Sequence, residues 1–189
     1  MMKKQLTLIV TFVMATMMTY GQQSLAVGDK APGFKATADD GSTWDVKQYL
    51  GKNFIVVYFY PAAMTGGCTA QACAYRDRKN DLQEAGAVVV GVSGDKVEGL
   101  RLFKLAENLN FPLLSDEKGD IARAFGVPTG DGGAIKRTVE GVEHELVRGV
   151  TARRWTFIIG KDGNIVYKND SVNAGNDTEE VLNFLSSRK

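Results

Sequence analysis

The sequence predicts an α/β fold in which helices pack on both faces of a mixed β-sheet. Three runs, at residues 54–60, 87–92 and 155–159, are mostly apolar and rich in β-branched and aromatic residues. Such runs are typical of central strands that are covered on both sides. Helix-forming stretches separate them, so strands and helices alternate along the chain. With 189 residues, 44% of them hydrophobic, the chain has enough apolar material for one compact domain.

Shorter strands are expected on either side of these runs. Residues 27–34 contain the Gly and Pro typical of an extended lead-in, and residues 41–43 predict a hairpin turn between two short edge strands. We expect residues 126–153 to make a small hairpin excursion around residues 138–142, where apolar and polar residues alternate.

Turn and cap residues place the remaining elements. Asp162 and Gly163, followed by the apolar residues 165–167, are the strongest hairpin signal in the chain and predict two antiparallel strands. The predicted helices cover residues 67–85, ended by Gly86; residues 96–108; residues 121–125; and residues 177–186, with Asn176 or Asp177 as the cap.

The first residues follow the three-part plan of a secretory signal peptide. Lys3 and Lys4 precede an apolar stretch at residues 6–18, and small or polar residues follow at positions 19–22. This apolar stretch is short for a membrane span. The pattern therefore indicates export.

We expect a signal peptide at residues 1–21 and a domain at residues 22–189, with residues 24–26 as the second option for the cut. The mature protein would then be periplasmic or otherwise extracytoplasmic, without stable membrane insertion. An uncleaved membrane anchor is the alternative, although such an anchor is normally longer and more uniformly apolar.

Composition argues against several classes of protein. Lys plus Arg (23) nearly balances Asp plus Glu (22), and no run of like charges stands out, so nucleic acid is not an expected partner. Two cysteines and one histidine, His144, do not make a set of metal ligands. We expect no metal and no other cofactor.

The two cysteines, Cys68 and Cys73, come directly after the strand predicted at residues 54–60. Cys68 would therefore lie in the first turn of the following helix. Backbone N–H groups of a first turn have no intrahelical partner, and together with the aligned peptide dipoles they favour thiolate over thiol. The sequence thus predicts a reactive Cys68.

Pro61, Thr65 and Cys68 have the spacing Pro-x-x-x-Thr-x-x-Cys, and Cys73 follows five positions later. This segment resembles the active-site signature of the peroxiredoxins. The position of the second cysteine makes it similar to the peroxiredoxin Q subfamily, also called bacterioferritin comigratory protein, and the likeness runs from Val27 to the C-terminus. The resemblance implies a thioredoxin-like fold and a thiol-dependent peroxidase acting on hydrogen peroxide and organic hydroperoxides.

The resemblance also implies a role for each residue of the site. Cys68 would be the peroxidatic cysteine, which attacks the hydroperoxide and becomes a sulfenic acid. Thr65 would hydrogen-bond the peroxide, and Pro61 would shield the thiolate from water. Arg154, in an Arg-x-Thr-Phe pattern, would stabilise the thiolate and the charge on the leaving oxygen. Arg153 is the competing guanidinium, but Arg154 has the expected offset to the Phe.

Cys73 is implied by the resemblance to resolve the sulfenic acid as an intramolecular disulfide, which a thioredoxin-like protein would then reduce. In one regular helix Cys68 and Cys73 are about 7.5 Å apart along the axis and about 140° apart around it. Their Cα atoms then exceed the roughly 7 Å that a disulfide can bridge. We therefore expect the first turns of the helix to unwind after oxidation, in a monomer or weak homodimer.

Three positions depart from the subfamily pattern. Gly66 stands where Pro is usual, Gln71 stands where Glu is usual, and residues 62–64 replace a more polar loop. We interpret these changes as tuning the substrate range or the reactivity of the thiolate without abolishing activity.

Three other roles are open to the two cysteines or to the domain that carries them. In an exported chain two cysteines often form a structural disulfide, but Pro61, Thr65 and Arg154 in the same pattern favour catalysis. A thioredoxin-like thiol–disulfide oxidoreductase would need Cys-x-x-Cys and a proline where Trp155 stands. If the chain were a redox-inert binding or holdase domain, the occurrence of Thr65, Cys68 and Arg154 in this pattern would be a coincidence.

Overall fold

The computed structural model describes residues 24–188, so the predicted signal peptide at residues 1–21 lies outside the described residues. The strands are β1 (Lys35–Ala38), β2 (Thr43–Asp45), β3 (Phe54–Phe59), β4 (Ala87–Ser93), β5 (Leu113–Ser115), β6 (Thr129–Val139), β7 (Val142–Ala152), β8 (Trp155–Ile159) and β9 (Ile165–Asn169). The helices are α1 (Gly66–Asp77), α2 (Lys79–Glu84), α3 (Val97–Glu107), α4 (Asp120–Phe125) and α5 (Asp177–Ser186), with a short 3-10 helix, η1 (Val46–Gln48).

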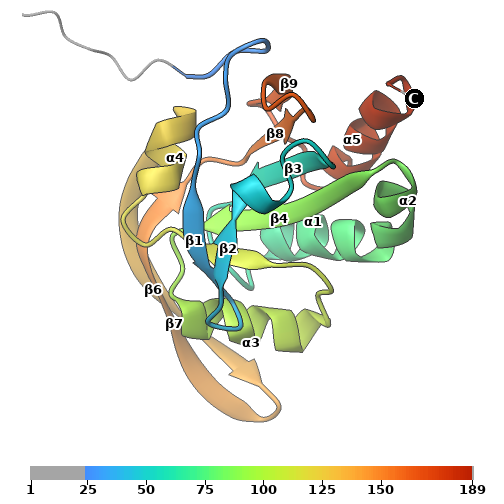
Figure 1. Cartoon of the computed structure of the whole chain (residues 1–189). Helices are drawn as coiled ribbons and strands as arrows, with labels where there is room; N and C mark the ends of the chain where they lie inside the picture. Colours follow the sequence, from blue (N-terminus) through green and yellow to red (C-terminus); the bar gives the residue numbers. More distant parts are fainter. Residues whose placement is uncertain (1–23, 189) are drawn as a thin grey trace, which may run out of the picture.

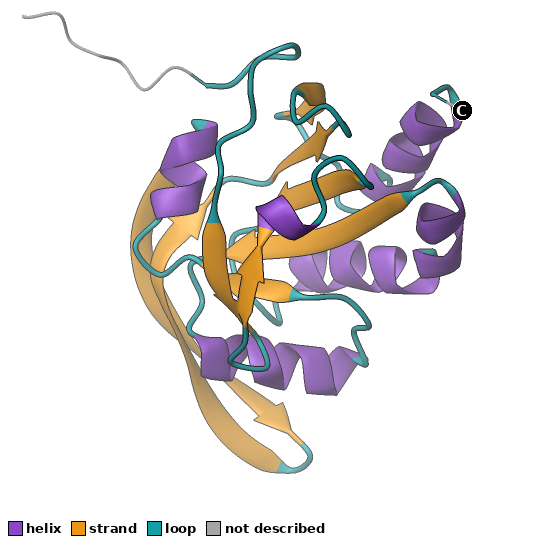
Figure 2. Ribbon diagram, in the orientation of Figure 1, coloured by secondary structure: helices purple, strands orange, loops and turns teal. Residues whose placement is uncertain are grey.

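A mixed sheet forms the centre of the molecule (Figures 1 and 2). Its strand order is β2-β1-β5-β4-β3-β8-β9, and β6 and β7 form a separate hairpin. The three predicted central runs are adjacent in this sheet, because β3 pairs in parallel with β4 and antiparallel with β8. The predicted hairpins are also present: β1 pairs antiparallel with β2, and β8 with β9. These pairings confirm the predicted mixed sheet.

Helices cover both faces because the side chains of β3 alternate between two apolar cores. Val56 and Tyr58 belong to the core formed with α1, α2, α3 and α5. Ile55, Val57 and Phe59 belong to the opposite core, which is closed by α4, η1 and the β1–β2 hairpin. Cys68 lies in the first of these cores, so one face of the sheet carries the site.

The prediction of one helix over residues 67–85 is wrong in part, because the structure has two helices there. Arg78 separates α1 from α2, with backbone angles of φ −104° and ψ 18°. Its N–H donates to the carbonyls of Ala74 and Arg76, which closes α1. The turn redirects the chain so that α2 packs against β4, with Leu82 buried in the core.

The excursion after Gly126 is a hairpin, as predicted, but it is far larger than expected. Its strands β6 and β7 are 11 residues long each, and the chain turns at Glu140 and Gly141, both of which have positive φ. In Figure 1 the ribbon curves along one side of the molecule and ends beyond α3. Glycines at the start of β6 interrupt the alternation of apolar and polar side chains. The sequence pattern therefore indicated only the tip of the hairpin.

The middle of β7 forms backbone hydrogen bonds with the segment after β4. Gly149 N–H donates to the Gly94 carbonyl at 2.9 Å, and Lys96 N–H donates to the Val147 carbonyl at 3.0 Å. A Cβ on Gly94 would lie 2.1 Å from the Val150 carbonyl oxygen, so only glycine permits this approach. The contact fixes the hairpin beside Asp95, two residues after the end of β4.

The strand β5 was not predicted, because three residues are too few for a periodic signal.

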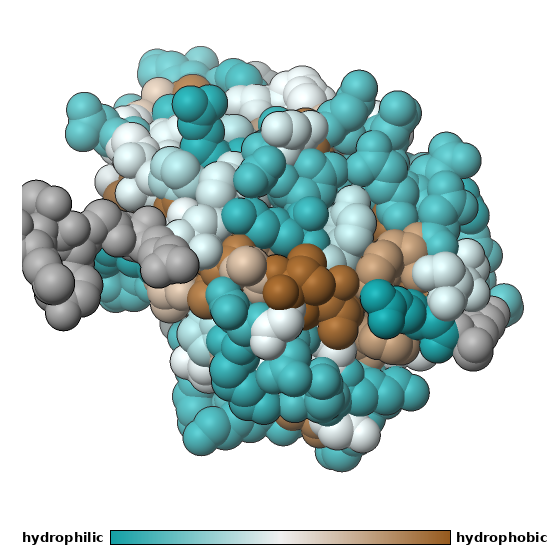
Figure 3. All heavy atoms as spheres, turned by 90° about the horizontal axis from the view of Figure 1, so that it is seen from above, coloured by the Kyte–Doolittle hydropathy of each residue, from teal (hydrophilic) through white to brown (hydrophobic). Residues whose placement is uncertain are grey.

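The surface is largely hydrophilic on the face that Figure 3 shows, where a limited hydrophobic area interrupts it. Within residues 24–188, no helix combines the length and the apolar composition that a bilayer span requires.

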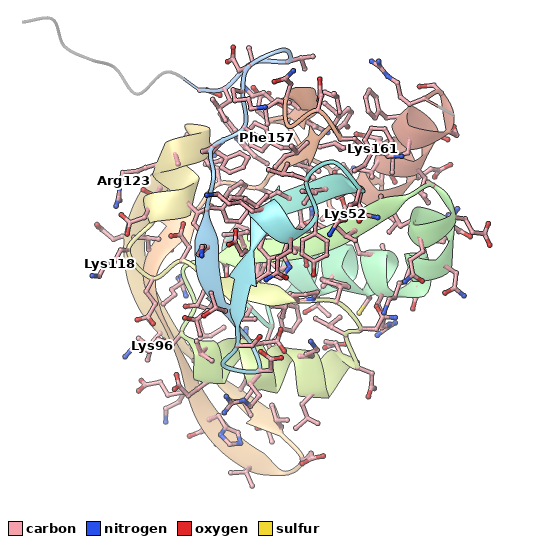
Figure 4. All side chains as sticks on the ribbon, viewed as in Figure 1. Lys52, Lys96, Lys118, Arg123, Phe157 and Lys161 are labelled. Atoms are coloured by element: carbon pink, nitrogen blue, oxygen red, sulfur yellow. The ribbon has the colours of Figure 1, made fainter. Side chains whose placement is uncertain are left out.

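Phe157 belongs to the core on the face of the sheet opposite Cys68, and its substitution tests that core. Its ring packs 5.2 Å from Phe125 and 6.1 Å from Phe59, between centroids, and lies in the interior in Figure 4. We expect Phe157→Ala to lower the free energy of unfolding by about 3–5 kcal/mol, since it leaves a cavity in a fully buried aromatic cluster. The control Leu105→Ala, at a half-exposed position of α3, should change it by less than about 0.5 kcal/mol in urea denaturation. Equal effects of the two changes would contradict this account of the core.

Candidate active site

Cys68 is the third residue of α1 and is 1% exposed. The helix begins because Thr65 is extended (φ −106°, ψ 148°), while its carbonyl accepts the first intrahelical hydrogen bond, from Thr69 at 2.8 Å. The N–H groups of residues 66–68 precede that bond and point toward the start of the helix. Cys68 therefore has the first-turn position that the sequence predicted, in a setting that favours negative charge.

Arg154 lies directly against this sulfur. Its Nη2 donates to Cys68 Sγ at 3.3 Å from the short link between β7 and β8. Gly67 makes room for the guanidinium, since a Cβ there would lie 3.3 Å from Nη2. Arg153, the competing arginine, is exposed instead. The tertiary structure thus selects Arg154 as the cation beside Cys68.

A buried chain of hydrogen bonds holds Arg154 from behind. Its Nη1 donates to Gln71 Oε1 at 2.6 Å, and Gln71 Nε2 donates to Asp177 Oδ2 at 2.7 Å. The same oxygen accepts from Tyr75 at 2.7 Å and from Thr156 at 2.9 Å. Burial raises the pKa of Asp177, and the three hydrogen bonds oppose that rise.

The Thr65 hydroxyl, directly before α1, is already committed as a hydrogen-bond donor. The Oγ1–H donates to the Ala62 carbonyl at 2.9 Å and makes no side-chain cap to the helix. The proton of the hydroxyl points away, so its lone pairs can accept a hydrogen bond from a bound O–H group. The Thr65 side chain does not cap the helix, and its role toward a hydroperoxide stays a prediction.

The loop before α1 is anchored to the sheet through Asp95. The Asp95 carboxylate accepts the Ala63 N–H and the Ser93 hydroxyl, both at 2.8 Å. Asp95 is 1% exposed, and burial raises its pKa while both hydrogen bonds act in the opposite direction. The loop is thereby fixed at the end of β4.

The long hairpin holds the same loop from the other side. Met64 has φ 55°, a left-handed conformation that costs a non-glycine residue roughly 1–3 kcal/mol. Its carbonyl accepts a hydrogen bond at 2.8 Å from Nε of Arg137, in β6. The hairpin thus helps to hold a strained turn two residues after Ala62, directly before the site.

Aromatic side chains form the floor beneath Cys68. Tyr58 and Tyr60 are buried, and the ring of Tyr58 stacks on Tyr75 at 4.9 Å between centroids. Burial raises the pKa of each of these tyrosines, so all three stay protonated at neutral pH. The floor is therefore neutral and largely apolar, and it limits the access of water to the sulfur.

Cys73 lies on α1 as well, one and a half turns after Cys68. It is a free thiol and only partly buried, and its Sγ lies 3.6 Å from Glu107 Oε2 at the end of α3. Burial is the main cause that raises the pKa of Cys73; the Glu107 carboxylate adds to the rise, and Arg76 opposes it. Both cysteines therefore sit in one continuous helix, with Cys73 held as a thiol.

Among the predicted site residues, Arg154 is the one whose side chain the structure places against the Cys68 sulfur. Thr65 takes the N-cap position of α1, three residues before Cys68. Pro61 lines a surface pocket beside Arg154, together with Pro128 and Thr151. Cys73, the fifth, points toward α3 instead. Within residues 24–188, no cluster of three or more His, Cys, Asp or Glu is arranged to hold a metal ion.

Sequence reasoning missed the residues that support the site from a distance. Asp177 was expected only as a helix cap, although Asn176 takes the cap position and Asp177 is buried. Gln71 and Asp177 are 106 positions apart, so no local pattern could pair them. Asp95 and Arg137 carried no signal either. Gln71 itself had been noted as a departure from the subfamily pattern, but its partner Asp177 had not.

The chain matches a protein-family model over most of its length. Residues 27–168 match the model of the AhpC/TSA family. Peroxiredoxin Bcp of Escherichia coli K12 is 39% identical over 161 residues, which cover 85% of this chain and 96% of that protein. Peroxiredoxin Bcp of Bacillus subtilis is 36% identical over 162 residues, covering 86% and 96%.

Solved structures agree with the sequence comparison. Peroxidoxin BcpB of Mycobacterium tuberculosis has a TM-score of 0.72 at 29% identity, covering 86% of this chain and 97% of that one. A PrxQ mutant of Xylella fastidiosa has a TM-score of 0.73 at 25% identity, covering 88% and 98%. The thioredoxin-like fold is therefore shared with solved peroxiredoxins. The chain belongs to the AhpC/TSA family and is a peroxiredoxin similar to the Bcp and PrxQ proteins.

Proposed function

We propose that this peroxiredoxin reduces hydrogen peroxide and organic hydroperoxides at Cys68 and resolves the product through Cys73. One observation carries the proposal: a buried sulfur at the start of a helix lies 3.3 Å from the Arg154 guanidinium. Thr65, with its lone pairs available, stands three residues before this sulfur. This arrangement offers a nucleophile, a cation and a hydrogen-bond acceptor to one small substrate.

In the first step the Cys68 thiolate attacks the terminal oxygen of the hydroperoxide. The S–O bond forms as the O–O bond breaks, so sulfur is oxidised to a sulfenic acid and the peroxide is reduced to an alkoxide or hydroxide. That leaving oxygen takes up a proton, which balances the one that the Cys68 thiol released on becoming a thiolate, and departs as alcohol or water. Arg154 is placed to stabilise the developing negative charge, and Thr65 is placed to orient the peroxide O–H.

In the second step Cys73 attacks the sulfenic acid sulfur of Cys68. The S–S bond forms, the S–O bond breaks, and the hydroxide that leaves takes the thiol proton to become water. A dithiol protein of thioredoxin type then reduces the disulfide by exchange. Both cysteines lie in α1, so this step requires part of α1 to unwind.

Removal of the cation should slow the first step. We expect Arg154→Met to slow Cys68 oxidation by hydrogen peroxide by about 10² or more, because a preorganised charge at the transition state contributes a few kcal/mol. Thr65→Val should act in the same direction. Stopped-flow fluorescence of the reduced protein measures both rates.

Two controls accompany these variants. Arg153→Met removes the neighbouring exposed guanidinium and should stay within about threefold of the wild-type rate. Cys68→Ser should abolish donor-coupled peroxide consumption. Turnover that survives Cys68→Ser, or near wild-type oxidation of Arg154→Met, would exclude the proposed mechanism.

Oxidation should open α1 locally. Under hydrogen exchange we expect amides at residues 67–76 to lose protection in the oxidised protein, while β4 stays protected, since a disulfide cannot span one and a half turns of intact helix. The Cys73→Ser variant, which stops at the sulfenic acid, should keep its protection. A disulfide-linked dimer, or an intramolecular disulfide with α1 fully protected, would contradict this step.

We also propose that the protein is exported and processed, on the basis of Lys3, Lys4 and the apolar residues 6–18. The mature chain would then begin near Gln22. Intact-mass measurement on the extracytoplasmic fraction should find this shortened chain, whereas a Met1 terminus or recovery from the cytosol alone would count against export.

A further inference from the structure

Asp177 is a buried carboxylate on which donors from two other elements converge. Gln71 Nε2 and Tyr75 Oη, both from α1, and Thr156 Oγ1, from β8, all donate to its Oδ2, at 2.7, 2.7 and 2.9 Å. Its side chain is fully buried at the start of α5. Oδ1 has no hydrogen-bond partner among the described residues. The carboxylate thus accepts all three hydrogen bonds at one oxygen, Oδ2.

This convergence determines which way the Gln71 amide faces. Oδ2 of Asp177 offers only lone pairs, so Gln71 has to present Nε2 to it. Oε1 of Gln71 then faces Arg154 Nη1 at 2.6 Å and accepts its hydrogen bond. A reversed amide would set oxygen against oxygen on one side and donor against donor on the other, both in a buried place.

The orientation of the amide is passed on to the reacting sulfur. With Nη1 of Arg154 held by Gln71, the other terminal nitrogen, Nη2, lies 3.3 Å from Cys68 Sγ. The guanidinium is planar and rigid, so fixing one nitrogen limits where the other can lie. Asp177 does not touch the sulfur, yet each contact between them is a directional hydrogen bond.

We propose that Asp177 is a positioning residue for the peroxidatic site: it sets the Gln71 amide, which in turn aims the Arg154 guanidinium at Cys68. This inference rests on the proposed function, because it concerns the step in which Cys68 reacts with peroxide. The chain of contacts joins α5, α1 and the start of β8. The C-terminal helix thereby takes part in shaping the site.

Asp177→Leu and Asp177→Asn separate positioning from other roles. Leu removes the acceptor, so oxidation of Cys68 by hydrogen peroxide should slow by about 10-fold or more as the guanidinium loses its alignment. Asn keeps an acceptor oxygen where Oδ2 lies and puts its amide nitrogen where Oδ1 has no partner, so its rate should stay within about threefold of wild type.

A second rate distinguishes positioning from a general loosening of the fold. Alkylation of Cys68 by iodoacetamide uses the same thiolate but develops no charge on a leaving oxygen. It is measured in the Cys73→Ser background, so that only one thiol reacts. In Asp177→Leu we expect alkylation to fall by less than about threefold, so the ratio of oxidation to alkylation drops. Loss of fold would change both rates together.

Asp116→Leu is the matched control for stability. Asp116 is a buried carboxylate that accepts the N–H groups of Ile121 and Ala122 at the start of α4, on the other face of the sheet. Its replacement should lower the melting temperature but leave the ratio of oxidation to alkylation unchanged. Gln71→Met, which keeps Asp177 intact, should reproduce the lowered ratio even where Asp177→Leu is too unstable to purify.

The outcomes are distinguishable. An unchanged ratio in Asp177→Leu and Gln71→Met overturns the inference, and so does a ratio in Asp177→Asn as low as in Asp177→Leu. If Asp116→Leu lowers the ratio equally, the effect is one of stability and the inference also fails. Failure of the proposed function itself would appear separately, as peroxidase turnover in Cys68→Ser or fast oxidation of Arg154→Met.

Discussion

The contact between Arg154 and Cys68 is the constraint on which the rest of the site depends. It requires the first turn of α1 and the start of β8 to meet at hydrogen-bond distance, although the two residues are 86 positions apart. The sheet achieves this because β3 leads into α1 and pairs directly with β8. The Arg154 guanidinium and the Cys68 sulfur are therefore in contact in a buried site without a long flexible segment between them and the sheet. This keeps the guanidinium preorganised for reaction.

Two further layers hold this contact in place. The loop before α1 is anchored to the end of β4 through Asp95 and to the long hairpin through Arg137. Behind Arg154, Gln71 leads to Asp177 at the start of α5. Buried polar groups cost free energy unless they are hydrogen-bonded, and most atoms of these chains are paired. Orienting the site residues therefore costs the protein some free energy of folding, and the strained backbone of Met64 adds to that cost.

The proposed reaction cycle places two opposing structural requirements on α1. Folded, its residues Gln71 and Tyr75 bind Asp177 and close the core around Cys68. A bond between Cys68 and Cys73, however, cannot form across intact helical turns. The proposed cycle therefore alternates between a packed helix that reacts with peroxide and an opened one that forms the disulfide. In this proposed cycle the opening would be confined to α1, because the helix breaks at Arg78 and α2 packs separately against β4.

The sequence by itself determined the α/β class, the central strands, the hairpin at Asp162 and the first-turn position of Cys68, since these follow from local periodicity and turn chemistry. Only the tertiary structure decided which arginine meets the sulfur, how long the β6–β7 hairpin is, and that Asp177 supports the site instead of capping a helix. The reason is physical: a hydrogen bond between residues some hundred positions apart leaves no periodic trace in either segment. Burial, which gives such a bond its strength, is a property of the packed fold.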